Sequence, residues 1–238
     1  MYKRQIPYYS FARSDKKDAP RISITARLVA DLIQTAGATH VMTMMLHAPQ
    51  VHGFFSVPAD PLSSRPVLQG HFHDGDLSDT IVVTPDMGHI KSAIRFAENL
   101  GLPVAAANKE RVSDTTVKIS GVVGEPLSGF RRALIYDDEV ATGGSVVELT
   151  DLLVSEGIEE MWVVCTHGVF VRGGLDRLCL HPHITRVIAT DTVCIPNAYE
   201  HPKLEVVSVA RIFGEAIRRN YLQASIGDLF VFGEEEEA

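Results

Sequence analysis

Apolar residues are arranged along the chain in two alternating patterns: short continuous runs, and positions repeated every three or four residues. The first repeated pattern predicts an amphipathic helix over residues 25–35, with Gly37 as its stop. A mostly apolar run over residues 40–46 then predicts a short buried strand that ends at His47. The beginning of the chain is therefore expected to hold one helix followed by one strand.

The alternation is clearest after residue 78, where apolar runs and helical spacing follow each other regularly. Strands are expected at residues 80–84, 104–107, 132–136, 161–166, 186–190 and 204–207, and helices at residues 88–100, 146–155 and 212–221. Strands that alternate with helices of about ten residues imply right-handed crossovers and hence a mainly parallel sheet. The pattern predicts an α/β fold.

Prolines and serines between residues 58 and 78 indicate a connection between two structural units. We therefore expect two domains, residues 1–66 and residues 67–238. One helix and one strand are too few to close the first domain, so we expect that residues preceding Met1 complete it. The four glutamates at residues 234–237 predict a solvated end of the chain.

Composition narrows the classes of partner. The 238 residues carry a formal net charge of -8, which argues against a general nucleic-acid binder because neutralising phosphates requires excess lysine and arginine. A small phosphorylated substrate needs only a local positive site or a metal. The three cysteines lack metal-ligand spacing and indicate reduced thiols. Apolar runs too short to span a bilayer and an amino terminus unlike a signal peptide predict a cytoplasmic protein with no membrane partner.

The strongest candidate for chemistry is the segment Leu134-Ile135-Tyr136-Asp137-Asp138-Glu139-Val140-Ala141-Thr142-Gly143-Gly144-Ser145. An apolar strand runs into two carboxylates and then into a glycine-rich turn that opens a helix. The glycines allow the backbone to approach a phosphate closely, and the start of the helix offers free N–H groups. The carboxylates suit the vicinal hydroxyls of a sugar, or a metal that bridges to it. Ligands of open α/β sheets bind at such strand ends.

This segment resembles the phosphoribosyl-binding loop of the phosphoribosyltransferase fold. Five further segments resemble, in the same order, parts of the ribose-phosphate pyrophosphokinase family. They are Pro7-Tyr8-Tyr9-Ser10-Phe11-Ala12-Arg13-Ser14-Asp15-Lys16-Lys17, Leu46-His47-Ala48-Pro49-Gln50-Val51-His52-Gly53-Phe54-Phe55, Val83-Thr84-Pro85-Asp86-Met87-Gly88, Asn108-Lys109-Glu110-Arg111 and Cys165-Thr166-His167-Gly168-Val169. The resemblance covers essentially the whole chain.

The resemblance to this family implies two phosphoribosyltransferase-like domains with mainly parallel sheets, the first of them incomplete here. It implies transfer of a pyrophosphoryl group from ATP to ribose 5-phosphate, giving phosphoribosyl pyrophosphate and AMP for nucleotide biosynthesis. It also implies Mg²⁺ as cofactor and assembly into homo-oligomers.

The resemblance also implies a role for individual residues. Ribose 5-phosphate is expected at Asp137, Asp138, Ala141, Thr142, Gly143, Gly144 and Ser145; ATP at Arg13, Ser14 and His47; and Mg²⁺ at His47 and Asp86. Catalysis is expected at Lys109 and Arg111, which lie in a polar segment predicted to be a loop. Ser14 stands where the family has an amide side chain. The His47 imidazole is expected to act through phosphate or water, because Mg²⁺ prefers oxygen ligands. The histidines without such support, at positions 52, 71, 73, 89, 181 and 183, are expected to be surface or structural residues.

Two departures from the family pattern leave alternatives open. Ala141 stands where the family has an acid before the threonine of the loop, and Met45 stands where it has an aspartate. A non-catalytic regulatory relative that joins the enzyme's oligomers would fit both departures and the missing first stretch of the family pattern. The retained Lys109 and Arg111 speak against that alternative. A phosphoribosyltransferase would fit the loop but leaves the segments around Arg13 and His47 unexplained.

Overall fold

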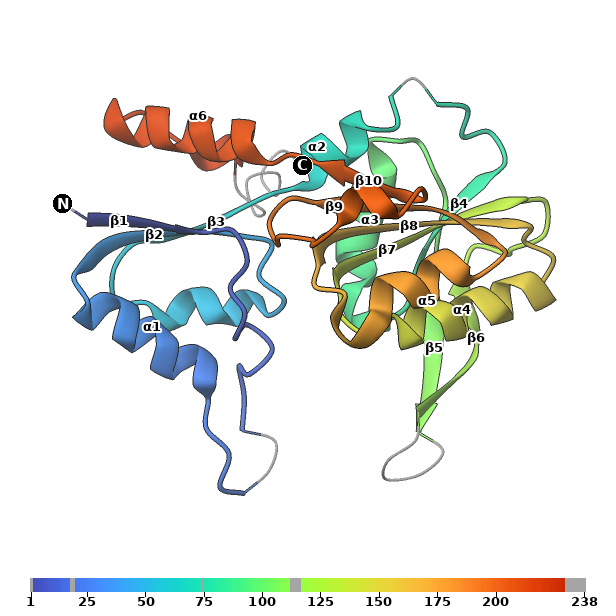
Figure 1. The fold of residues 1–238 in the computed structure, drawn as a ribbon, viewed down its shortest axis with the longest axis horizontal. Helices are drawn as coiled ribbons and strands as arrows, with labels where there is room; N and C mark the ends of the chain where they lie inside the picture. Colours follow the sequence, from blue (N-terminus) through green and yellow to red (C-terminus); the bar gives the residue numbers. More distant parts are fainter. Residues whose placement is uncertain (1, 18–19, 74, 112–116, 230–238) are drawn as a thin grey trace. The chain divides into compact units, whose positions relative to one another are not determined.

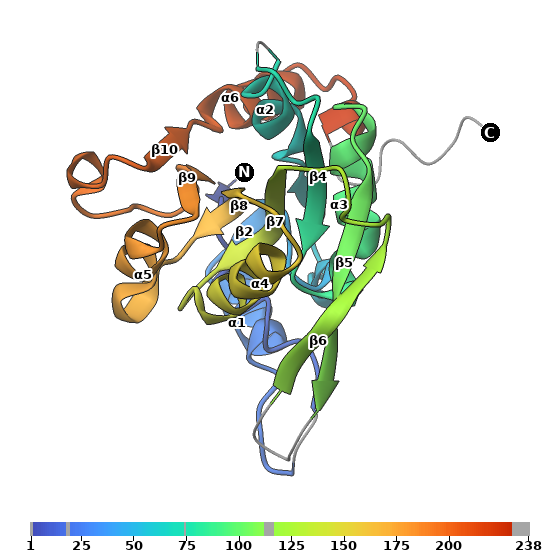
Figure 2. The ribbon, with the colours of Figure 1, turned by 90° about the vertical axis from the view of Figure 1, so that its right-hand side faces the viewer.

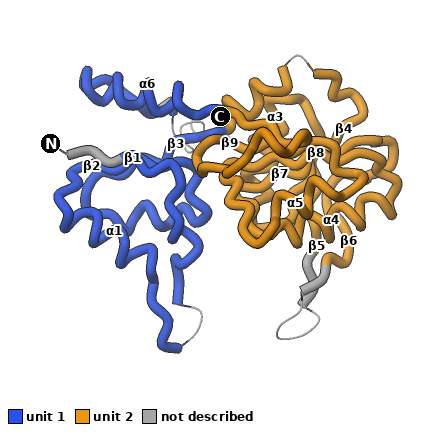
Figure 3. Tube along the Cα trace, in the orientation of Figure 1, with its two compact units in different colours: residues 1–64, 208–238 blue, residues 65–207 orange. Residues whose placement is uncertain are grey.

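The computed structural model describes residues 2–17, 20–73, 75–111 and 117–229, with side chains throughout except at residues 2–4, 109–111, 117, 118 and 228. The fold is α/β, as predicted, with one three-stranded and one seven-stranded sheet (Figure 1). Contacts between residues divide the chain into two compact units (Figure 3). Unit 1 consists of residues 1–64 and 208–238, and unit 2 of residues 65–207. Within the described residues, no helix is both long and apolar enough to cross a membrane.

Unit 1 is built on a parallel sheet with the strand order β1-β2-β3. Its elements are β1 (Tyr2–Ile6), α1 (Thr25–Thr35), β2 (Ala38–Met44), the 3-10 helix η1 (Pro49–Phe54), β3 (Ala59–Leu62), α6 (Ala210–Tyr221) and the 3-10 turn η5 (Gly227–Leu229). Ala26 of α1 and Val51 of η1 share an apolar cluster with Tyr9, whose hydroxyl donates to the Ala26 carbonyl at 2.7 Å. The helix predicted over residues 25–35 is confirmed as α1, and the strand predicted at 40–46 lies two residues earlier.

Unit 2 is built on a sheet with the order β10-β9-β8-β7-β4-β5-β6, in which every pair is parallel except β5 and β6. Its strands are β4 (Thr80–Thr84), β5 (Val104–Arg111), β6 (Val117–Gly124), β7 (Arg132–Val140), β8 (Glu160–Gly168), β9 (Ile184–Thr190) and β10 (Leu204–Val207). Its helices are α2 (Arg65–Gly70), α3 (Ile90–Glu98), α4 (Gly144–Ser155) and α5 (Gly174–Leu180), with 3-10 turns η2 (Met87–His89), η3 (Val171–Gly173) and η4 (Ala198–Glu200). Helices α4 and α5 cover one face of this sheet and α3 covers the other (Figure 2).

The central strands of unit 2 are buried on both faces, which explains their continuous apolar runs. Successive residues alternate between the two apolar clusters: Ile135 packs with α4 and α5, whereas Leu134 and Tyr136 pack with α2 and α3. The ring of Tyr136 stacks on Phe96 of α3 at a centroid distance of 4.3 Å. This packing fixes the strand that leads into the glycine-rich loop.

The sequence pattern did not predict several elements of the fold. The connection expected between residues 58 and 78 contains β3 and α2, and β3 tolerates Pro61 because it lies at the edge of its sheet. The strand expected at residues 104–107 continues to Arg111 and pairs antiparallel with β6, where a polar loop was predicted. A hairpin at the edge of a sheet does not need apolar residues at every position, so its polar end gave no strand signal.

The end of the chain differs from the predicted domain division. The predicted second domain ran from residue 67 to 238, whereas residues 208–238 group with unit 1. Asn220 of α6 lies 3.3 Å from the ring of His40 on β2, and the carbonyl of Leu229 accepts the N–H of Ser63 at 2.9 Å. These long-range bonds draw α6 to the three-stranded sheet.

Candidate functional site

The glycine-rich loop joins the end of β7 to the start of α4, as its sequence predicts. Gly143 has φ +72°, a left-handed conformation that glycine adopts without strain. Val147 is the first residue whose N–H bonds back along the helix, to the Gly143 carbonyl at 3.0 Å. The N–H groups of residues 144–146 have no intrahelical acceptor, and the helix dipole places partial positive charge there. This geometry suits a bound phosphate.

Helix α5 supports the loop from the side. A Cβ atom on Gly174, the first residue of α5, would come within 3.0 Å of the Ala141 carbonyl oxygen. The Arg177 guanidinium donates to the Thr142 carbonyl, and Gly143 lies against the Leu178 side chain. The loop is therefore held at its backbone, which leaves the N–H groups at the start of α4 available.

The tight contact at Gly174 predicts a loss of stability on substitution. Gly174→Ala is expected to lower the free energy of unfolding by about 1–3 kcal/mol, because the new methyl group meets backbone atoms that cannot rotate away. Gly214→Ala is the matched control: Gly214 lies inside α6 with open space around it, so alanine there should stabilise by about 0.5–1 kcal/mol. Denaturant unfolding measures both. A Gly174→Ala variant as stable as the wild type would show that the loop is not packed against α5.

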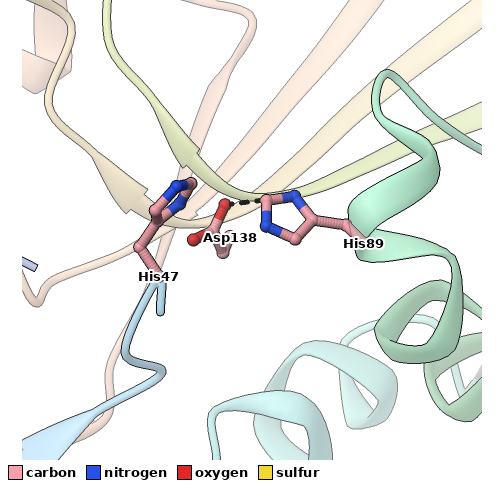
Figure 4. A group of neighbouring side chains, drawn as sticks. All are labelled: His47, His89 and Asp138. Carbon is pink, nitrogen blue, oxygen red and sulfur yellow. Dashed lines mark ion pairs between the residues drawn. The ribbon is translucent and has the colours of Figure 1, made fainter. Parts of the chain in front are cut away.

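Two carboxylates lie on β7 just beyond the end of the neighbouring strand β4. Asp138 is buried, and Asp137 accepts the backbone N–H of Asp138 at 2.9 Å. The ring of His89, in the turn η2 after β4, places its Nδ1 atom 3.1 Å from Asp137 Oδ1. The same atom lies 3.6 Å from Asp138 Oδ1 (Figure 4). Asp86 precedes this turn, and its carboxylate accepts the Gly88 N–H at 2.9 Å.

The charges of this cluster depend on one another. The hydrogen bond to Asp137, together with the charges of Asp138, Asp137 and Asp86, raises the pKa of His89 to about 9 against the opposing effect of burial. Burial, aided by the charge of Asp138, raises the pKa of Asp137 although His89 opposes that shift. At neutral pH His89 is therefore a cation in contact with Asp137 and Asp138. Carboxylate oxygens from adjacent strands are also the donors that Mg²⁺ prefers.

The residues predicted to bind ATP belong to unit 1. The Ser14 hydroxyl accepts the Thr25 N–H at 3.1 Å and donates to the Ser23 carbonyl at 3.2 Å, so it supports the start of α1. Arg13 is exposed beside it, and His47 follows the end of β2. Asp86, the other predicted metal ligand, belongs to unit 2.

The backbones of Lys109 and Arg111 lie at the far end of β5, paired with Ile119 and Val117 of β6. Their side chains are outside the part of the structure that is described. They were predicted in a loop, and the strand assignment corrects that prediction.

His89 is the residue that sequence reasoning missed, since a surface or structural role was expected for it. The signal available was its position three residues after Asp86, in the turn where a buried strand passes into a helix. A surface or structural role agrees better with two other histidines for which it was expected. His71 pairs with Glu205 at 2.7 Å, and His181 pairs with Asp151 at 3.1 Å.

Two family models match the chain: the N-terminal domain of ribose phosphate pyrophosphokinase over residues 5–37, and the phosphoribosyl synthetase-associated domain over residues 118–231. The ribose-phosphate pyrophosphokinase of Deinococcus radiodurans is 44% identical over 230 residues, which covers 94% of this chain and 71% of the relative. That of Clostridium acetobutylicum is 40% identical over 227 residues, which covers 94% of this chain and 70% of the relative.

A solved structure agrees with these relatives. The phosphoribosylpyrophosphate synthetase from Mycobacterium smegmatis matches with a TM-score of 0.83 and 32% identity, over 93% of this chain and 72% of that one. The chain thus spans about 70% of the length of the relatives it matches. Because its sequence, its fold and its glycine-rich loop all match this family, the chain belongs to the ribose-phosphate pyrophosphokinase family.

Proposed function

We propose that the chain transfers the β,γ-pyrophosphoryl group of ATP to the anomeric hydroxyl of ribose 5-phosphate, giving phosphoribosyl pyrophosphate and AMP for nucleotide biosynthesis. The observation that carries the proposal is the free helix start at residues 144–146, adjoining two carboxylates on β7, in a chain of this family. The reaction is an in-line displacement at the β-phosphorus. In such reactions catalysis consists mainly of positioning and of charge stabilisation.

Ribose 5-phosphate binds at the loop. The N–H groups of residues 144–146 and the hydroxyls of Thr142 and Ser145 hold its phosphate. Asp137 and Asp138 accept hydrogen bonds from the ribose hydroxyls, and His89 keeps both carboxylates oriented through its contacts at 3.1 and 3.6 Å. The backbone of Ala141 completes the loop beside Gly174.

Mg²⁺ fits the acidic end of β4 and β7 because the donors there are carboxylate oxygens. Asp86 would hold it, with His47 acting through phosphate or water. When bound, the ion supplies positive charge that neutralises the triphosphate.

ATP binds at the segment that contains Arg13, with the guanidinium directed to adenine or phosphate. Ser14 contributes by fixing this segment to α1 through its bonds to Thr25 and Ser23. Lys109 and Arg111 offset the charge that develops in the transition state. The proposal also includes the assembly of several copies of this chain into a homo-oligomer.

A non-catalytic regulatory subunit is the second candidate, and Ala141 favours it. The methyl group of Ala141 accepts no hydrogen bond, whereas the family pattern has an acid at this position. Ribose-phosphate binding would survive in such a protein, because backbone N–H groups form the cradle.

We expect the full-length gene product to release AMP when supplied with Mg²⁺, ATP and ribose 5-phosphate, measured by chromatography. The variant Ala141→Asp is prepared beside it. If the wild type releases no AMP and the Ala141→Asp variant does, the alanine in the loop is the cause of the lost activity. Silence in both, with ribose 5-phosphate still bound in calorimetry, would overturn the enzyme proposal in favour of the regulatory subunit.

A further inference from the structure

The hairpin formed by β5 and β6 contains an irregularity next to its proposed catalytic end. Asn108 pairs with Gly121, but the next residue, Lys109, pairs with Ile119, so Ser120 is an extra residue on β6. An extra residue of this kind is a β-bulge, which bends its strand and changes the direction of the side chains beyond it. The direction of the paired backbone beyond it, at residues 109–111 and 117–119, is therefore set at this bulge.

The bulge is held from two sides. Towards β5, the Asn108 amide lies 3.3 Å from the Ser120 hydroxyl, which in turn lies 3.3 Å from the Asn108 carbonyl. Towards the helix layer, the N–H of Ile119 donates to the Glu148 carboxylate at 2.9 Å. The Ile119 side chain packs against the apolar cluster that includes Leu149, the residue after Glu148.

Glu148 lies four residues after Gly144, and hence one turn along α4 from the proposed phosphate cradle. Helix α4 contacts β6, and Figures 1 and 2 show the two elements side by side. The strand β6 is the edge of the sheet, so its outward backbone groups would otherwise meet water. At Ile119, next to the bulge, the backbone N–H instead donates to the half-buried carboxylate of Glu148 on α4.

We propose that Glu148 is a positioning residue that links the ribose-phosphate cradle to the hairpin bearing Lys109 and Arg111. By accepting the Ile119 N–H, it fixes the bulge relative to α4 and so fixes the direction of the paired backbone at residues 109–111 and 117–119. The proposal rests on the proposed function and adds to it a connection between the substrate loop and the catalytic cations.

The test compares Glu148→Ala with Glu148→Gln, which keeps an oxygen acceptor, and with Glu156→Ala, an exposed carboxylate at the other end of α4. In Glu148→Ala, amide hydrogen exchange of residues 117–121 should quicken at least about tenfold. Its kcat should fall about tenfold, while calorimetric affinity for ribose 5-phosphate stays within about twofold of the wild type. Glu148→Gln and Glu156→Ala should resemble the wild type in all three measurements.

Unchanged exchange in Glu148→Ala would show that no fixed bulge depends on Glu148, and faster exchange with unchanged kcat would show that the bond does not position the hairpin. A Glu148→Gln variant as impaired as Glu148→Ala would assign the effect to charge. Each result overturns the proposal. A wild type that binds ribose 5-phosphate but forms no AMP refutes the proposed function instead, and exchange then still decides whether Glu148 fixes the bulge.

Discussion

Lys109→Ala is expected to lower kcat at least about a hundredfold while the KM for ribose 5-phosphate changes little. A hundredfold corresponds to about 2.7 kcal/mol of lost transition-state stabilisation, the size expected for removing one preorganised charge. Lys109 lies beyond the bulge of the hairpin, whereas the proposed ribose-phosphate contacts come from the loop after β7. Substrate binding should therefore survive the substitution. Steady-state kinetics of AMP release in the full-length gene product provide the measurement.

Lys203→Ala is the matched control for this variant. Lys203 precedes β10 and donates to the His181 carbonyl at 3.0 Å, and the proposal gives it no part in catalysis. Its kcat should be that of the wild type. An increase of KM in Lys109→Ala at unchanged kcat would contradict the prediction, because it would show that Lys109 binds the ground state as strongly as the transition state.

Gly144→Val is expected to weaken ribose 5-phosphate binding at least about a hundredfold without unfolding the protein. Among the described residues, a Cβ at Gly144 would meet only the Thr142 hydroxyl, at 3.8 Å, so there is room for the side chain. That room is the space into which a phosphate must approach the N–H groups of the first turn. The loss of affinity should therefore come from exclusion of the ligand and not from strain. Calorimetry with ribose 5-phosphate measures it.

Gly70→Val provides the same substitution at an exposed glycine of α2, where an added Cβ atom would meet none of the described residues within 4 Å. This variant should bind ribose 5-phosphate as the wild type does. Ser145→Ala removes one hydroxyl donor only, so its loss should be smaller, on the order of tenfold. If Gly144→Val and Gly70→Val both bind ribose 5-phosphate with wild-type affinity, the phosphate does not bind at the start of α4.

Features that depend on neighbours in the chain can be predicted from the amino-acid sequence. The strand, the two carboxylates and the glycine turn between residues 134 and 145 follow one another directly, so their order predicts a ligand loop without knowledge of the fold. Helix α1 was predicted with its bounds because its apolar spacing is amphipathic. The family resemblance likewise rested on short contiguous segments, and relatives 40–44% identical support it.

Only the tertiary structure placed His89 against Asp137. The two residues are 48 positions apart, and they meet because β4 and β7 are neighbours in the sheet although β5 and β6 lie between them in sequence. The contact of Glu148 with Ile119 and the grouping of α6 with unit 1 arise in the same way. Apolar spacing tells which face of an element is buried. The order of strands and the partners of polar groups depend instead on long-range packing and backbone pairing, which local patterns do not specify.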